Sequence, residues 1–238
     1  MKKTLGFILL MFGGSASVSW AVPVALDGTY FISGGVSILE GTGNLLSDDY
    51  SDTDSTPNVP LFGTASVTSP LDSSAISFAI ADSGTLVAAT DTVGFGEFVT
   101  ATTATNFSGS FIAPGGRMQL RLDFANDAFA SNVNSIAQAL LSFSLAGNGN
   151  ILFNEDFLFS GTDDQKQVFL RTFDLPTGLS GTFDISLSSL SGDFNSAANN
   201  TTSVAFRIDT VPVPEPAILP MLLSGLGLLG FISRKKHH

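Results

Sequence analysis

The clearest signal along this chain is an alternation of apolar and polar residues with a period of two. Every second side chain is apolar in residues 117–124 (R-M-Q-L-R-L-D-F), and the same holds in residues 183–187 (F-D-I-S-L). A period of two places the apolar side chains on one face of an extended strand, as in antiparallel strands with one buried face. Both segments are therefore predicted to be half-buried β-strands.

Similar strand-forming segments recur along the chain, separated by turns rich in Gly, Asn, Asp and Pro. Many short strands spaced about 8–12 residues apart are typical of a sandwich. We therefore predict an all-β, antiparallel, jelly-roll-like β-sandwich ectodomain over residues 22–211. The predicted strands, besides an opening hairpin, are 64–68, 75–80, 85–90, 95–100, 106–112, 117–124, 139–146, 151–160, 167–173, 182–190 and 202–211.

Three segments of the same region are less regular. Residues 27–40 contain β-formers around Gly34 and Gly35, which predicts a hairpin that turns at the two glycines. Residues 41–60 are rich in Gly, Pro, Ser and Asp and are predicted to form a long surface loop. Residues 125–136 are ambiguous between a loop and a short helical turn. The 21 Phe residues, against one Trp and two Tyr, are predicted to fill a core between two sheets.

The amino end, residues 1–21, has the layout of a secretory signal peptide. Lys2 and Lys3 form a positive start, residues 5–12 are apolar, and Ala21 follows a short segment with small residues. This order is that of a cleavable export signal, and we predict cleavage after Ala21. An uncleaved anchor is the alternative, but the apolar run is too short to span a bilayer.

The carboxyl end, residues 212–238, has three parts in order. Pro214 and Pro216 flank Glu215, and they fix the backbone and remove two hydrogen-bond donors, so this element is expected to be extended and accessible. The apolar run 217–232 would span about 24 Å as a helix, slightly less than a hydrocarbon core of ~30 Å. Basic residues close the chain. They are Arg234, Lys235 and Lys236.

The predicted orientation follows from these charges. Because basic residues stay on the cytoplasmic side, residues 217–232 are predicted to be a transmembrane helix with a basic cytoplasmic stop, and residues 22–211 lie across the membrane. On these grounds alone an ordinary C-terminal membrane anchor remains an alternative.

The combination is more specific than an anchor. Val213, Pro214, Glu215 and Pro216, the glycine-bearing apolar run and Arg234 together resemble the PEP-CTERM sorting signal. The resemblance covers about 24 residues, roughly a tenth of the chain. It implies recognition by an exosortase, a membrane-embedded cysteine protease or transpeptidase, and cleavage near the Pro-Glu-Pro element. It also implies a Gram-negative bacterium that makes exopolysaccharide.

Two features depart from that pattern. Pro220 lies inside the apolar run, and His237 and His238 end the chain. Whether the two histidines are native or the remainder of a tag is left open by the sequence.

Composition excludes several functions. Residues 22–211 contain 20 acidic and five basic residues, a formal charge of −15, so no basic patch exists for nucleic acid. The chain has no Cys, and both His residues are in the tail. Disulfides, thiol nucleophiles, Ser-His-Asp triads and His or Cys zinc sites are therefore excluded from this region. We assign no catalytic residue and expect no enzymatic activity.

Aspartates offer the remaining candidate chemistry, because Ca²⁺ prefers oxygen ligands. One group of aspartates lies within the predicted loop at 41–60. Its spacing is not that of an EF-hand, and solvated turn residues would also explain it. A second pair joins an early strand to a late one. The candidate calcium ligands are Asp48, Asp49, Asp52, Asp54, Asp27 and Asp209. No other cofactor is predicted.

These observations predict an exported, exosortase-processed protein of the envelope or extracellular matrix. Its role would be structural or adhesive and linked to exopolysaccharide or biofilm. The expected partners are an exosortase, the membrane before processing, and extracellular polysaccharide. After processing, the ectodomain would remain at the cell surface or become extracellular.

Two alternatives stay open. One is a calcium-dependent carbohydrate-binding module. The other is a secreted glycan hydrolase that uses two carboxylates. The adjacent acids Glu155 and Asp156 do not form such a pair, because neighbours on a strand point to opposite faces.

Overall fold

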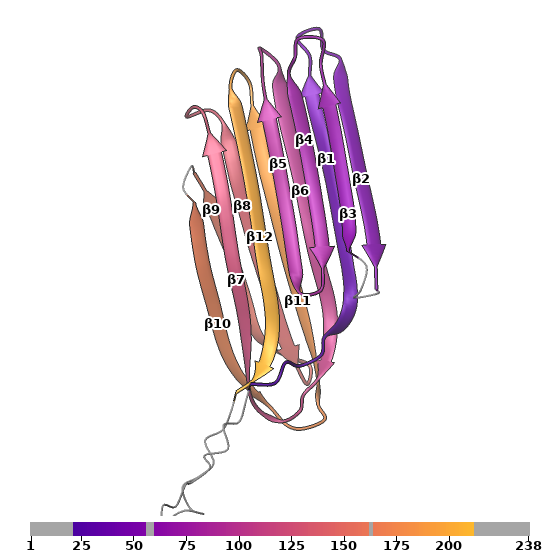
Figure 1. The fold of residues 1–238 in the computed structure, drawn as a ribbon, viewed down its shortest axis with the longest axis vertical. Coiled ribbons are helices and arrows are strands. Elements are labelled where there is room, and N and C mark those ends of the chain that lie inside the picture. Colours follow the sequence, from indigo (N-terminus) through magenta and orange to yellow (C-terminus); the bar gives the residue numbers. More distant parts are fainter. Residues whose placement is uncertain (1–20, 56–59, 162–163, 212–238) are drawn as a thin grey trace, which may run out of the picture. The chain divides into compact units, whose positions relative to one another are not determined.

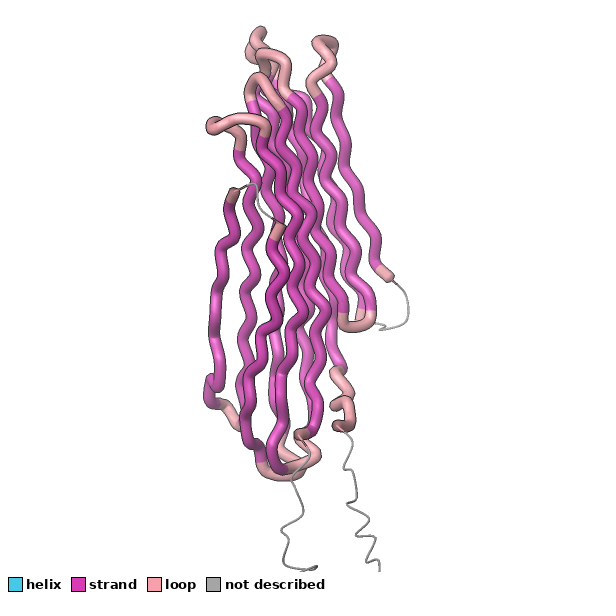
Figure 2. Tube along the Cα trace, turned by 60° about the vertical axis from the view of Figure 1, so that its left-hand side comes forward, coloured by secondary structure: helices cyan, strands magenta, loops and turns pink. Residues whose placement is uncertain are grey.

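The computed structural model describes residues 21–55, 60–161 and 164–211. Val22–Val211 form one compact unit, in which the regular structure of the described residues is all strand (Figure 2). Within these ranges no helix is long and apolar enough to cross a membrane. The predicted transmembrane helix, the Pro-Glu-Pro element and most of the predicted signal peptide lie outside the described residues.

Twelve strands follow one another along the chain. They are β1 (Asp27–Leu39), β2 (Leu45–Asp54), β3 (Leu61–Thr68), β4 (Ser74–Asp82), β5 (Thr85–Val93), β6 (Phe98–Ile112), β7 (Gly116–Ala130), β8 (Ile136–Gly147), β9 (Asn150–Ser160), β10 (Gln165–Leu175), β11 (Ser180–Asp193) and β12 (Ala197–Thr210).

The strands form two six-stranded antiparallel sheets, which appear as two layers in Figure 1. The first sheet has the order β2-β1-β6-β11-β8-β9, and the second has the order β10-β7-β12-β5-β4-β3. Buried apolar side chains from both sheets form the core, so the predicted all-β antiparallel sandwich is confirmed. The jelly-roll prediction concerns a finer order of connections and stays a prediction.

The alternation read from the sequence is confirmed in β7. Met118, Leu120 and Leu122 are fully buried, whereas their neighbours Arg117 and Arg121 are not. The apolar face of β7 packs toward the first sheet, and the polar face is on the outside of the second.

The predicted loop at 41–60 is wrong over residues 45–54, which form the edge strand β2. Pairing with β1 along the whole of β2 outweighs the low strand propensity of its aspartates. Tyr50 anchors the strand, because its ring lies where a side chain on Gly63 would be, and its hydroxyl lies 2.6 Å from Thr103 Oγ1. Sequence composition could not show this interlock between three strands.

The predicted turn at Gly34 and Gly35 is also wrong. β1 runs through both glycines without a break, and the chain turns only after Leu39. A Cβ at Gly34 would lie 2.6 Å from the Tyr50 ring, so the glycine is required by a close approach rather than by a turn.

The ambiguous segment 125–136 is mostly strand. β7 extends to Ala130, and a tight connection follows in which the side-chain oxygen of Asn132 accepts hydrogen bonds from the backbone N–H groups of Asn134 and Ser135. The apolar residues of this segment do not alternate regularly with polar ones, so they gave no strand signal.

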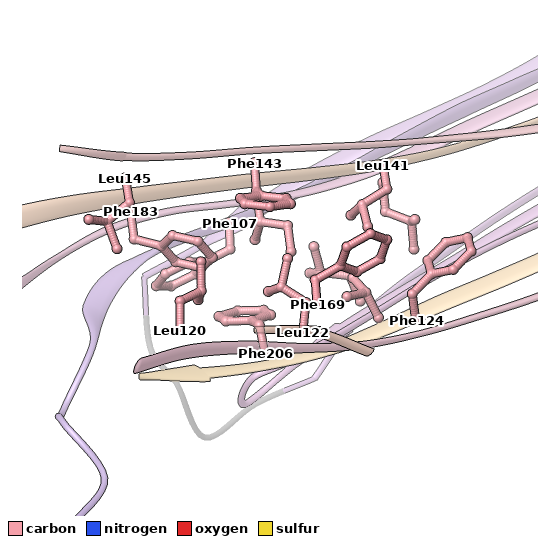
Figure 3. Packing of buried hydrophobic residues seen from close by; sticks show 14 of the residues in the cluster. Phe107, Leu120, Leu122, Phe124, Leu141, Phe143, Leu145, Phe169, Phe183 and Phe206 are labelled. Atoms are coloured by element: carbon pink, nitrogen blue, oxygen red, sulfur yellow. The ribbon is translucent and has the colours of Figure 1, made fainter. Parts of the chain in front are cut away.

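Phenylalanines fill the interior between the sheets, as predicted (Figure 3). Phe107 lies at the centre of an aromatic group, with ring centroids 4.8 Å from Tyr30, 5.1 Å from Phe206 and 6.4 Å from Phe183. Six other phenylalanines of the described residues are exposed, so the core does not take all of them. They are Phe31, Phe62, Phe95, Phe98, Phe129 and Phe194.

Part of the interior is polar, which the sequence analysis did not anticipate. Thr90 of β5 and Ser189 of β11 are buried and joined by a 2.9 Å hydrogen bond between the two sheets. Ser189 Oγ also donates to the Asn200 carbonyl oxygen. Thr90 and Ser189 thus have hydrogen-bond partners inside the sandwich.

Carboxylates link the two sheets along both lateral sides of the sandwich. On one side Asp48 of β2 accepts a 3.0 Å hydrogen bond from the Ser66 N–H of β3. On the other, Arg171 of β10 donates two hydrogen bonds to Glu155 of β9, one of 2.6 Å from Nε. Inward-pointing charges of this kind discourage edge strands from pairing with other chains.

The ion pair between Glu155 and Arg171 gives a stability prediction. Hydrogen bonds from Arg171 hold the pKa of Glu155 below its ordinary value. The pair therefore stabilises the fold above the unfolded-state pKa of Glu, about 4.3, and this stabilisation is lost as the pH falls through the folded value. Glu155→Gln is expected to lower the free energy of unfolding by about 1–2 kcal/mol near neutral pH.

Urea unfolding at neutral and acidic pH measures this effect. Asp156→Asn is the matched control, since Asp156 is the exposed neighbour on the same strand. An equal loss in both variants, or a Glu155→Gln loss that persists at acidic pH, would contradict the prediction.

The two ends of the unit meet. Val24 N donates to Ile208 O at 2.8 Å, and Thr210 N donates to Val22 O at 2.9 Å, so residues 22–24 lie against the end of β12. The last strand is an interior strand, paired with β5 on one side and β7 on the other.

Candidate functional site

A shallow groove of about 350 Å³ lies on the outer face of the second sheet. It crosses four adjacent strands, β4, β5, β12 and β7, so its residues come from sequence segments far apart. Its side chains combine an apolar wall with carboxylates, an amide and a hydroxyl. They are Ile76, Phe78, Asp91, Asp127, Asn199 and Thr201.

Strand register explains how these residues meet. Ile76, Asp91, Asn199 and Phe129 pair in one row across the four strands. The next row on the same face contains Phe78, Ala89, Thr201 and Asp127. The small side chains of Ala89 and Thr201 lie between two larger ones, which leaves the surface hollow there.

Aromatic side chains flank the groove. Phe62 of β3 contacts Phe78 edge to face, with ring centroids 5.2 Å apart, and both belong to the outer surface. Phe129 is 48% exposed beside Asn199 at the other side. Exposed apolar rings next to hydrogen-bonding groups are the usual composition of a ligand site.

Two carboxylates interact at the β7 side of the groove. A hydrogen bond with Asp164, followed by the repulsion of its charge, raises the pKa of Asp127. Both groups are exposed, so solvent screens much of this effect.

The predicted calcium ligands are not brought together by their strands. Asp48 faces inward and bonds to Ser66, whereas Asp49 faces outward from the same strand. Asp27 belongs to the first sheet, and Asp209 belongs to the second, where its Oδ2 lies 2.9 Å from Arg207 Nε.

Across residues 21–55, 60–161 and 164–211, no three acidic or histidine side chains gather in a way that suits a metal ion. Asp52 and Asp54 likewise lie on β2. Calcium binding by these six residues stays a prediction that rests on the sequence alone.

The other predicted site residues belong to the termini. Ala21 is exposed next to the first paired residues. Val213, Pro214, Glu215, Pro216 and the basic residues 234–236 lie outside the described residues. The groove was missed because Asp91, Asp127 and Asn199 carry no local motif, and only the pairing of β5, β12 and β7 brings them together.

The fold defines an all-β sandwich protein with a shallow groove on the outer face of one sheet. Residues 212–236 match the model of the PEP-CTERM protein-sorting motif, which confirms the resemblance seen in the sequence. This motif marks an exported protein that is anchored at the membrane and processed by an exosortase. No curated protein matches the chain.

Several solved structures show a distant likeness to this chain. TmCBM61 in complex with beta-1,4-galactotriose is 9% identical, with a TM-score of 0.28 over 62% of this chain and 86% of that one. A structure of carbohydrate-binding modules from the beta-sandwich superfamily is 11% identical, with a TM-score of 0.19 over 77% of this chain and 85% of that one. The GH31 alpha-xylosidase from Xanthomonas citri is 9% identical, with a TM-score of 0.23 over 77% of this chain and 19% of that one. At such scores the strand order itself, rather than any neighbour, defines the fold.

Proposed function

We propose that the chain is a structural or adhesive protein of the cell envelope or extracellular matrix, linked to exopolysaccharide and biofilm, and that it holds a neutral polysaccharide in the groove of the second sheet. The groove supports this, because it joins apolar rings to hydrogen-bonding groups. A pyranose ring has apolar C–H faces and a rim of hydroxyls. A C–H face can pack against Phe78 while the hydroxyls form hydrogen bonds with Asp91 and Asn199.

The charge of the surface supports a neutral ligand. The groove has carboxylates and no basic lining residue, and the region 22–211 has a formal charge of −15. A polyanionic chain would therefore be repelled, whereas the hydroxyl groups of a neutral chain can donate hydrogen bonds to the carboxylates. Hydrogen bonds to charged groups contribute about 1.5–3 kcal/mol each.

Binding without turnover fits the spacing of the acids. Asp91 and Asp127 are separated by β12 and by two residues along the strands, which puts their Cα atoms roughly 12 Å apart. Glycosidases hold their two carboxyl groups, rather than their Cα atoms, about 5–9.5 Å apart, and Asp91 and Asp127 would reach that range only with both side chains leaning toward each other across β12. Asp127 and Asp164 share a hydrogen bond and are too close to each other for that role.

A binding measurement tests the proposal. Asp91→Ala is expected to weaken retention of the full chain on immobilised neutral glucan by about 10- to 100-fold, the loss of one charge-assisted hydrogen bond. Asp49→Ala is the matched control, because Asp49 is an exposed outward aspartate on β2, far from the groove.

The outcomes separate the proposed roles. Equal retention of both variants and the original chain would overturn the groove assignment. Release of shortened glucan that stops in Asp91→Ala would replace the adhesive role by a hydrolase. Retention that requires calcium would favour the calcium-dependent binding module.

A further inference from the structure

A second groove, of about 290 Å³, lies on the outer face of the first sheet. It crosses β6, β11 and β8, and the residues that form it alternate with the buried aromatic and aliphatic residues of the same strands. Its polar side chains are almost all uncharged. They are Asn106, Ser108, Ser142, Ser144, Asp184 and Ser186, together with Asn154 of the neighbouring strand β9.

Strand register again makes the site. Asn106, Ser186 and Ser142 pair across the three strands in one row, and Ser108, Asp184 and Ser144 pair in the next. No large side chain stands between the rows on this face, so the groove is a shallow hollow between short polar side chains.

Asp184 is held in place at the centre of this surface. Ser108 Oγ donates a short hydrogen bond to Asp184 Oδ1, and Ser144 Oγ lies 3.5 Å from Oδ2. The carboxylate is exposed and is thus oriented from both sides by neighbouring strands while it keeps acceptor capacity toward solvent.

This chemistry selects a ligand that carries hydroxyl groups and no charge. The Asp184 carboxylate accepts hydrogen bonds, the serines and Asn106 can both donate and accept them, and the groove offers no cation to an anionic ligand. A neutral saccharide meets these requirements, because each of its hydroxyls can donate one hydrogen bond and accept others.

We propose that the first-sheet groove is a second saccharide site and that the chain is therefore a noncovalent cross-linker of two polysaccharide strands. The inference rests on the function proposed for the second-sheet groove. Because the two sheets pack through their inner faces, their outer grooves point away from each other, and one polymer chain in each can be held without collision.

Binding stoichiometry tests the proposal without depending on how the chain assembles. The full chain in detergent micelles is titrated by calorimetry with cello-oligosaccharides and laminari-oligosaccharides. Two sites per chain are expected. Asp184→Ala and Asp91→Ala are each expected to leave one site, with an affinity loss of about 10- to 100-fold at the altered groove. Asp49→Ala should keep both.

Every other result overturns one or both of the proposed sites. One site that disappears in Asp91→Ala and persists in Asp184→Ala overturns the cross-linker while the proposed function stands. One site that disappears only in Asp184→Ala overturns the second-sheet assignment and, with it, the cross-linker. No binding by the original chain overturns both. Circular dichroism of each variant shows whether a lost site reflects a lost fold.

Discussion

Replacing Phe183 by Ala is expected to lower the free energy of unfolding by about 3–5 kcal/mol, the usual cost of removing a buried phenyl group. Phe183 is fully buried, and its ring centroid lies 5.5 Å from that of Phe206 and 6.4 Å from that of Phe107. It thus joins β11 of the first sheet to β12 of the second. A loss of this size is a large share of the 5–15 kcal/mol that stabilises most domains.

Urea unfolding followed by circular dichroism measures this loss. Phe98→Ala is the matched control, because Phe98 is 52% exposed and exposed positions usually change stability by less than about 0.5 kcal/mol. Similar losses in the two variants would show that the aromatic group does not hold the sheets together.

Changing Pro214, Glu215 and Pro216 together to Ala is expected to abolish processing of the chain in a bacterium that makes an exosortase. The sequence predicts that the two prolines keep this element extended, whereas alanines favour helical backbone. The unprocessed precursor should then accumulate in the membrane fraction, as seen by its mass and by its absence from the medium.

Pro220→Ala is the control for that experiment, since it removes a proline of the same tail that is a departure from the sorting pattern. It is expected to leave processing intact. Release of a normally shortened product by the triple variant would show that the Pro-Glu-Pro element is not what the exosortase reads.

The sequence predicted what depends on local pattern. The strict alternation around Leu120 indicates a strand by itself, and the tail at Pro214–Pro216 carries its own motif, later matched by the sorting model at residues 212–236. In both cases the information lies within a few consecutive residues, so no knowledge of the fold is needed.

What the sequence could not predict depends on pairing between distant strands. β2 looks like a loop until Tyr50 is placed between Gly34 and Gly63. The grooves have the same origin, because Asp91 meets Asn199, and Asp184 meets Ser108, only through strand register. Composition indicated acidic residues but not which of them share a face.

The position of the last strand has a mechanical consequence. Any tension applied to the chain beyond residue 211 passes into β12 at its carboxyl end. Because β12 lies between β5 and β7, a pull along it loads two ladders of hydrogen bonds in shear, whereas an edge strand could be peeled off one bond at a time. The tether therefore leaves the fold at a point suited to bearing a load.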